Sequence, residues 1–216
     1  MARSGDTDAC IIGRSSSHFT RVARIFAEEL AVPYTLAPVY DMTSMEPRDY
    51  GGNPALKLPV LTTTRGTIFG ALNICRALAE IAPVPKRIVW PEAMRDPELI
   101  NAQELIWHGM QAQVQLAFGT LVANLPADNL YFAKAAAGLR NGLRWLDRNL
   151  EDLRATLPPR HLSVLEVTLF CLVDHLAFRG TLAVEPFGNL RGFAGEFRAR
   201  PSAERTPYRF DALGGD

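Results

Sequence analysis

A cluster of three prolines between positions 83 and 91 divides the 216-residue chain into two parts of different character. Proline has no backbone N–H and a fixed φ angle, so such a cluster interrupts helices and strands alike. Before it, short apolar runs alternate with amphipathic segments, and after it only long amphipathic segments follow. The sequence therefore predicts an α+β fold with an N-terminal domain over residues 1–82, a linker over residues 83–95 and an all-helical domain over residues 96–216.

The amino-acid composition argues against nucleic acids and membranes as binding partners. Lys plus Arg and Asp plus Glu both number 23, so the chain lacks the basic excess that nucleic acids and anionic membranes require. The longest apolar run, residues 164–173, is too short and too charged to span a bilayer. Residues 1–8 are polar, unlike a secretory signal. We therefore expect a cytoplasmic protein that binds a small molecule, with no nucleic acid and no membrane as partner.

The cysteines and histidines argue against disulfides and metal sites. Cys10, Cys75 and Cys171 are far apart, odd in number and set in apolar surroundings, which is typical of buried free thiols in a reducing compartment. The histidines show no metal-ligand spacing. We expect no CxxC chemistry and no bound metal.

The N-terminal part alternates between strand and helix patterns. Strands are expected at residues 9–13, 34–39, 60–63 and 67–69, with a hairpin turn at Arg65 and Gly66. Helices are expected after Ser17, which is placed as an N-cap, and over residues 72–82. In the first helix the apolar side chains share one face, and the opposite, polar face carries Arg21, Arg24, Glu28 and Glu29.

The second part carries helical patterns only. Ser163 and Glu166 have the spacing of a capping box, in which each side chain satisfies the other's free amide. The helix that follows them is apolar nearly all round, so we expect it at the buried centre of the domain. A tail with Pro201 and Pro207 ends the chain. The helices are expected over residues 96–125, 128–157, 163–178 and 189–198.

Residues 53–61 place a proline at the start of a short apolar strand. Pro59 cannot donate to a sheet ladder, so we expect it at the start or edge of the strand. The Leu58–Pro59 bond is of the kind that can be cis, which would turn the backbone of Leu58 outward. An outward peptide beside a strand can pair with an extended, peptide-like ligand. A plain loop followed by an edge strand explains the same residues.

These features together resemble the cytosolic glutathione S-transferase family, in particular its bacterial, serine-type members, over nearly the whole chain. The resemblance implies a thioredoxin-like N-terminal domain that binds glutathione as co-substrate. It also implies a helical domain that contributes the pocket for a small electrophile, and a homodimer. The places that carry it are residues 17–21, Leu58–Pro59, the Ser163/Glu166 box and residues 200–207.

The same resemblance assigns a catalytic role to a serine before the first helix. Such a hydroxyl stabilises the thiolate of glutathione, which is the nucleophile. Ser17 fits this position best, with Ser16 and Ser15 as the next candidates for contact with glutathione. An N-cap needs the same residue type at the same place, so Ser17 is equally well explained as a cap alone.

The chain departs from the family at Gly70 and Ala71. Family members usually place an acidic residue followed by serine here, to hold the γ-glutamyl group. Backbone amides at the helix start remain able to receive a carboxylate. Losing one charge-assisted hydrogen bond costs about 1.5–3 kcal/mol, so glutathione affinity is expected to fall about tenfold to a hundredfold. Leu58, Pro59, Gly70 and Ala71 complete the expected glutathione site, and Asn73 compensates in part.

The resemblance places the second-substrate pocket on the helix after the linker, where we expect Trp107, Met110, Gln111 and Val114. A stripe of this kind at helical spacing is more often part of a core. Two functions follow. The first is a glutathione-dependent transferase or isomerase acting on a small hydrophobic electrophile. The second is a non-catalytic binding or scaffold protein that retains the fold and has lost glutathione.

Overall fold

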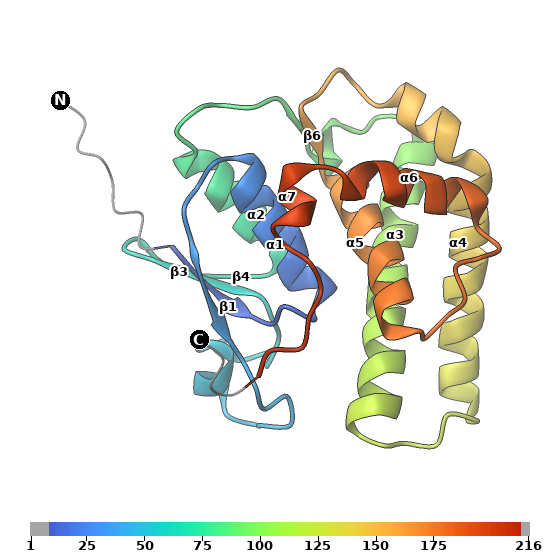
Figure 1. Cartoon of the computed structure of the whole chain (residues 1–216), viewed down its shortest axis with the longest axis horizontal. Helices are drawn as coiled ribbons and strands as arrows, with labels where there is room; N and C mark the ends of the chain where they lie inside the picture. Colours follow the sequence, from blue (N-terminus) through green and yellow to red (C-terminus); the bar gives the residue numbers. More distant parts are fainter. Residues whose placement is uncertain (1–8, 213–216) are drawn as a thin grey trace. The chain divides into compact units, whose positions relative to one another are not determined.

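The computed structural model describes residues 9–212, which fall into two compact units (Figure 1). One unit contains residues 9–86 together with residues 201–212, and the other contains residues 87–200. The tail was expected in the helical domain but belongs instead to the unit that holds the N-terminal sheet. The reason lies in its contacts with the first helix, described below.

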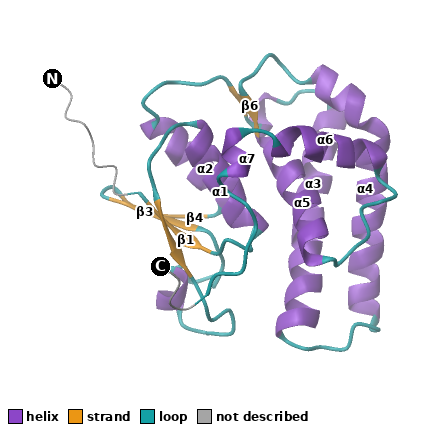
Figure 2. Ribbon diagram, in the orientation of Figure 1, coloured by secondary structure: helices purple, strands orange, loops and turns teal. Residues whose placement is uncertain are grey.

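A four-stranded mixed sheet forms the centre of the first unit. Its order is β2-β1-β3-β4, in which β1 and β2 are parallel and the other neighbours are antiparallel. Two helices, α1 and α2, pack against each other beside the sheet (Figure 2). This is the thioredoxin-like arrangement that the sequence predicts. The bounds are β1 Cys10–Gly13, α1 His18–Glu29, β2 Thr35–Pro38, the short helix η1 Pro47–Tyr50, β3 Val60–Thr63, β4 Gly66–Phe69 and α2 Ala71–Ile81.

The hairpin between β3 and β4 differs from the prediction by one residue. Thr63 pairs with Gly66, so Gly66 belongs to the strand and the two turn residues are Thr64 and Arg65. Gly66 has a φ of 130°, a backbone conformation that residues with a side chain rarely adopt. The hairpin was predicted correctly, but Gly66 is the first residue of β4 and not a turn residue.

The polar face of α1 is covered by residues from the end of the chain. Arg21 is only 2% exposed, and its Nη2 donates to the carbonyl of Ala203 over 3.4 Å. Its guanidinium carbon lies 4.2 Å from the centre of the Tyr208 ring. Arg205 bonds to Glu28, and Ser202 donates to Glu29, each over 2.6 Å. The covering residues belong to α7, Pro201–Glu204, and to the tail that follows it.

The second unit is helical, apart from one short parallel strand pair. The strands β5, Ile88–Val89, and β6, Leu162–Ser163, pair with each other, and β5 lies in the segment expected as a linker. Helix α5 is the buried centre, as predicted, with eleven of its sixteen residues buried. The remaining bounds are η2 Pro91–Ala93, α3 Pro97–Ala117, the π-helical η3 Phe118–Val122, α4 Leu130–Thr156, α5 Val164–Arg179 and α6 Gly188–Arg198.

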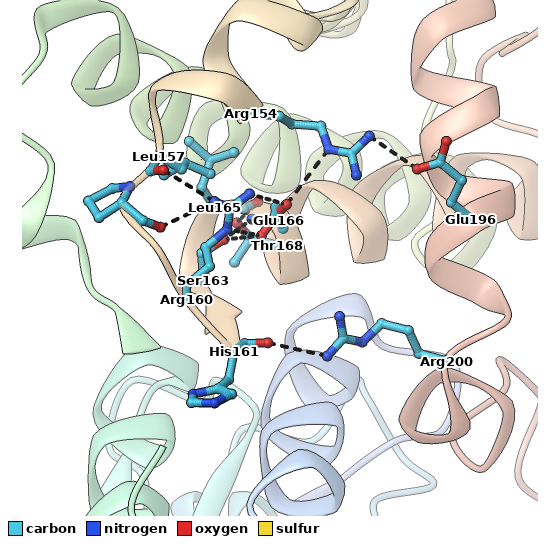
Figure 3. A network of polar contacts seen from close by, with 11 residues as sticks. Arg154, Leu157, Arg160, His161, Ser163, Leu165, Glu166, Thr168, Glu196 and Arg200 are labelled. Carbon is cyan, nitrogen blue, oxygen red and sulfur yellow. Dashed lines mark hydrogen bonds and ion pairs between the residues drawn. The ribbon is translucent and has the colours of Figure 1, made fainter. Parts of the chain in front are cut away.

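The capping box at the start of α5 is present and forms part of a wider charge network (Figure 3). Ser163 Oγ accepts the N–H of Glu166 over 3.1 Å, as predicted. The carboxylate of Glu166 does not reach back to a backbone amide, because the guanidinium of Arg160 holds both of its oxygens at 2.7 Å and the Ser163 hydroxyl donates to one of them. Arg154 lies 3.7 Å from the same carboxylate and bonds to Glu196 over 3.1 Å.

The sequence also led to expectations about disulfides, membrane-spanning helices and metal sites. None of the three cysteines forms a disulfide; Cys75 and Cys171 are buried and Cys10 is half-buried. Within residues 9–212, no helix is both long enough and apolar enough to cross a bilayer. The same residues contain no group of three or more His, Cys, Asp and Glu side chains arranged to hold a metal ion.

Candidate functional site

Three segments singled out by the sequence meet at one end of the sheet. Because β1 and β3 are antiparallel, the end of β1 lies beside the start of β3, with Ile12 opposite Val60. The end of β4 lies there as well, since Val60 pairs with Phe69. The serine turn, Leu58–Pro59 and the start of α2 are therefore brought together. A hydrogen bond of 3.3 Å from the N–H of Gly70 to the carbonyl of Pro59 joins the last two.

The three serines of the turn differ in exposure. Ser15 is 0% and Ser16 is 1% exposed, whereas Ser17 is half-buried. Ser17 is the N-cap of α1, and its oxygen accepts the N–H of Thr20 over 3.3 Å. Since that oxygen serves as an acceptor, its own O–H proton is available to a ligand. Ser17 is thus the most accessible of the three hydroxyl groups.

The start of α1 is held close to the end of β1 by a glycine. A Cβ atom at Gly13 would lie 2.5 Å from the side chain of Thr20, so any larger residue would push the helix away from the strand. The hydroxyl of Thr20 also accepts the N–H of Arg14 over 3.3 Å. Strand, turn and helix start therefore form one fixed unit, which places the first amides of α1 beside Ser17.

A further residue at this turn comes from the C-terminal tail. The backbone N–H of Ser15 donates to Oδ2 of Asp211 over 2.8 Å. The hydroxyl of Ser15 has no hydrogen-bond partner among the described residues. Sequence reasoning missed Asp211, because a side chain that pairs 196 positions away leaves no local pattern.

The Leu58–Pro59 peptide bond is cis, one of the two possibilities left open by the sequence. Pro59 is buried directly before β3, whereas Leu58 is half-buried. Within residues 9–212, neither the N–H nor the carbonyl of Leu58 makes a hydrogen bond. The preceding loop is held by Asn53, whose side chain donates to the carbonyl of Lys57 over 2.8 Å. The chain thus presents an unpaired peptide group at the edge of the candidate site.

The start of α2 offers backbone groups and no polar side chain. Gly70 is the N-cap with a φ of 85°, and no side chain caps the helix. Asn73 does not fill this role, since its amide nitrogen donates to the carbonyl of Phe69 over 3.2 Å. Ala71 is 6% exposed at the first helical position. The first amides of α2 therefore remain open to an anionic group.

The residues expected to line a second pocket lie on α3. Trp107 and Val114 are half-buried and Gln111 is exposed, and their spacing places them on one face of the helix. Met110, at the same helical spacing, is 0% exposed and lies in the core of the helical unit. The four residues thus share one side of α3, with Met110 the most deeply buried of them.

Comparison with known protein families gives one match. Residues 16–81 match the family model described as the N-terminal domain of glutathione S-transferase. This segment is therefore similar to the N-terminal domain of glutathione S-transferases. The match contains Ser16, Ser17, Leu58–Pro59 and Gly70–Ala71, so the family's N-terminal domain includes nearly all of the candidate site described above.

Solved structures extend the similarity to the whole fold. A glutathione S-transferase from Methylobacterium radiotolerans in complex with glutathione sulfonate is 21% identical, with a TM-score of 0.74 over 97% of this chain and 100% of that chain. One from Methylobacillus flagellatus with glutathione bound is 20% identical, with a TM-score of 0.72 over 93% and 99%. One from Pseudomonas fluorescens Pf-5 with bound glutathione is 16% identical, with a TM-score of 0.74 over 94% and 100%. A search of curated proteins finds no match.

Proposed function

We propose that this protein is a glutathione S-transferase, which binds glutathione at the sheet end described above and transfers it to a small hydrophobic electrophile, or isomerises such a compound. The observation that supports the proposal best is Ser17. Its half-buried hydroxyl lies at the start of α1, and its oxygen is already occupied as an acceptor from Thr20. That leaves one proton to donate, which is what a thiolate needs.

The chemistry requires the thiol to ionise. A free cysteine thiol has a pKa of about 8.5, so at neutral pH most of it is protonated and weakly nucleophilic. A hydrogen bond from Ser17 and the positive end of α1 both favour the ionised form and lower the pKa of the thiol. The sulfur electron pair then forms a bond to the electrophilic carbon while a leaving group departs with its own pair. In an isomerisation the sulfur adds to the substrate and is later released.

Backbone groups would hold the tripeptide. The unpaired N–H and carbonyl of Leu58 suit the two hydrogen bonds by which an extended peptide adds beside a strand. The open amides at the start of α2 suit a carboxylate, which the helix dipole also favours. Since neither contact uses a charged side chain, we expect weaker binding than a site with an acid at position 70 would give.

The electrophile site and the assembly are proposed from the family. Trp107 and Val114 supply an apolar surface on α3, and Gln111 supplies a polar group next to it. Such a mixture is typical of pockets for small hydrophobic compounds. We expect a cytoplasmic homodimer, which light scattering of the purified protein would test.

A second function rests on two observations. Gly70 and Ala71 provide no acid and no hydroxyl, and the carboxylate of Asp211 lies on the amide of Ser15, where it would repel a thiolate. Both would weaken the binding of glutathione. The alternative is therefore a glutathione S-transferase fold retained as a binding or scaffold protein without catalysis.

Calorimetric titration with glutathione tests the two functions, followed by turnover with a panel of electrophiles. The transferase predicts saturable binding in the millimolar range or tighter, and turnover that falls at least tenfold in Ser17→Ala. Ser44→Ala is a matched control, since Ser44 is also half-buried but lies in the loop before η1. No heat of binding at several millimolar glutathione, together with no thiol-dependent turnover, would support the scaffold.

A further inference from the structure

The helical unit contains a cavity of about 580 Å³ beside α4. Its walls are one face of α4 and the loop of residues 180–187 that joins α5 to α6, which runs beside α4 in Figure 1. A volume of this size falls in the range of small-molecule sites. The lining residues are Arg140, Arg144, Asp147, Arg148, Thr181, Leu182, Ala183, Pro186 and Phe187.

Three of the lining residues are arginines on successive turns of one helix face. Arg140, Arg144 and Arg148 are spaced four residues apart, so their guanidinium groups follow each other along about 12 Å of α4. Arg140 and Arg148 make no hydrogen bond or ion pair with any residue in the range 9–212. Arg144 donates to the neutral side chain of Asn141 over 3.1 Å. The row is therefore not neutralised by the protein.

The acidic groups near the three arginines do not neutralise their positive charge. Asp147 is the one acid in the lining, and its Oδ1 accepts the backbone N–H of Leu190 over 2.9 Å, at the start of α6. Glu151 and Asp152, one turn beyond Arg148, form no ion pair within the described part of the chain. With three arginines and one aspartate, the cavity carries a net charge of about +2.

Repulsion between the three guanidinium groups destabilises the helix unless an anion binds to them. Like charges four residues apart destabilise a helix by a few tenths of a kcal/mol per pair. The chain as a whole is balanced, with 23 basic and 23 acidic residues, so the row is not part of a generally basic surface. An anionic ligand would remove this repulsion and explain why the arginines face one cavity.

The chemistry of the walls identifies the kind of anion. Guanidinium groups bind phosphate through two parallel hydrogen bonds, and a row of three suits a chain of phosphates better than one isolated group. Leu182, Ala183 and Pro186 provide an apolar surface for an organic part. We propose that this cavity binds a small organic compound carrying two or more phosphate groups, such as a nucleoside diphosphate.

Calorimetric titration of the whole protein with ADP at low salt tests the proposal. We expect saturable binding that weakens at least tenfold in Arg144→Gln and again in Arg140→Gln, since each removes a charge-assisted contact. Arg95→Gln is the matched control: it removes one exposed arginine of the same unit, outside the cavity, and should change the affinity less than twofold.

Three results would overturn the proposal. The first is no saturation at several millimolar ADP, and the second is an equal loss of affinity in Arg95→Gln and Arg144→Gln. The third is tighter binding of an oligoglutamate peptide than of ADP, which would assign the row to an acidic protein segment. Melting temperatures of all variants establish that they fold. Because the cavity uses none of the glutathione-site residues, the outcome is independent of glutathione binding.

Discussion

The carboxylate of Asp211 accepts a hydrogen bond of 2.8 Å from the backbone N–H of Ser15, two residues before the half-buried hydroxyl of Ser17. The last described segment of the chain is thereby fixed to the start of the candidate catalytic turn. A carboxylate near a developing thiolate disfavours that thiolate, because like charges raise the pKa of each other's acid. Asp211 is thus placed to weaken the very site to which it is bonded.

Replacing Asp211 with asparagine tests this relationship. Asparagine retains an oxygen acceptor for the Ser15 amide and loses the charge. We expect Asp211→Asn to bind glutathione several-fold more tightly at pH 8, with a smaller gain at pH 6, where the thiol stays protonated. Calorimetry measures both. Glu204→Gln, an exposed acid of α7 in the same tail, is the control, and an equal gain in it would contradict the local effect.

The two roles of Ser17, as cap and as thiol ligand, are separable by substitution. Asparagine caps helices as well as serine but has no hydroxyl, whereas alanine does neither. We expect Ser17→Ala to lose about 1 kcal/mol of unfolding free energy and Ser17→Asn to lose almost none. Both should raise the pKa that governs kcat/KM with glutathione by about 1–2 units, the equivalent of one charge-assisted hydrogen bond. Urea unfolding and pH–rate profiles supply the measurements.

A result in which Ser17→Asn retains the wild-type pH profile would show that Ser17 is a cap alone. Ser17→Thr, which keeps both the hydroxyl and the cap, should behave like the wild type in both experiments.

Two substitutions of Ala71, at the first helical position of α2, should change glutathione affinity in opposite directions. Ala71→Ser adds a hydroxyl next to the open amides, and one charge-assisted hydrogen bond of about 1.5–3 kcal/mol to a carboxylate corresponds to about tenfold to a hundredfold tighter glutathione binding. Ala71→Val places bulk at the same site and should weaken binding by at least tenfold. Ala77→Ser, in the middle of α2, controls for the effect of serine on the helix. Affinities that do not respond to either change at Ala71 would remove α2 from the glutathione site.

The features that the sequence predicts correctly are those set by neighbours within a few residues. The N-caps Ser17 and Ser163 each bond to an amide three positions further on, so type and spacing reveal them. The four strands of the sheet are short apolar runs with polar or glycine boundaries, which a periodicity analysis detects. For the same reason the two-domain character follows from the change of pattern at the prolines.

The features that the sequence did not predict depend on distant partners. Arg21 has the spacing of a surface residue, yet the carbonyl that buries it belongs to Ala203, 182 positions away. The pairing of Ser15 with Asp211 spans 196 positions. In the capping box, Arg160 takes the carboxylate of Glu166 because two charge-assisted hydrogen bonds are stronger than one to a neutral amide. No local pattern distinguishes these outcomes from a solvated face or a plain box.

Glu166 predicts how stability depends on pH. Its burial alone would raise the pKa of the carboxyl group, but hydrogen bonds from Arg160 and Ser163 and the charges of Arg160 and Arg154 outweigh burial and lower the pKa below its ordinary value. A carboxyl group whose pKa is lowered by folding stabilises the native state above its unfolded pKa and loses that contribution as pH falls through the folded pKa. We therefore expect the unfolding free energy to drop below about pH 4.5.

Glu166→Gln removes the group that causes this drop. The variant should be less stable than the wild type at pH 7 by about 1–3 kcal/mol, since it leaves the guanidinium of Arg160 without its charged partner. The difference should shrink as the pH falls toward 3, which urea unfolding at several pH values measures.

Glu196→Gln is the control, because Glu196 bonds to Arg154 in the same network but its side chain is 65% exposed. Exposed ion pairs contribute about 0–1 kcal/mol, so this variant should keep the pH dependence of the wild type. An equal loss of unfolding free energy in both variants would mean that both carboxylates stabilise the protein through Arg154. The burial of Glu166 would then not explain its contribution to stability.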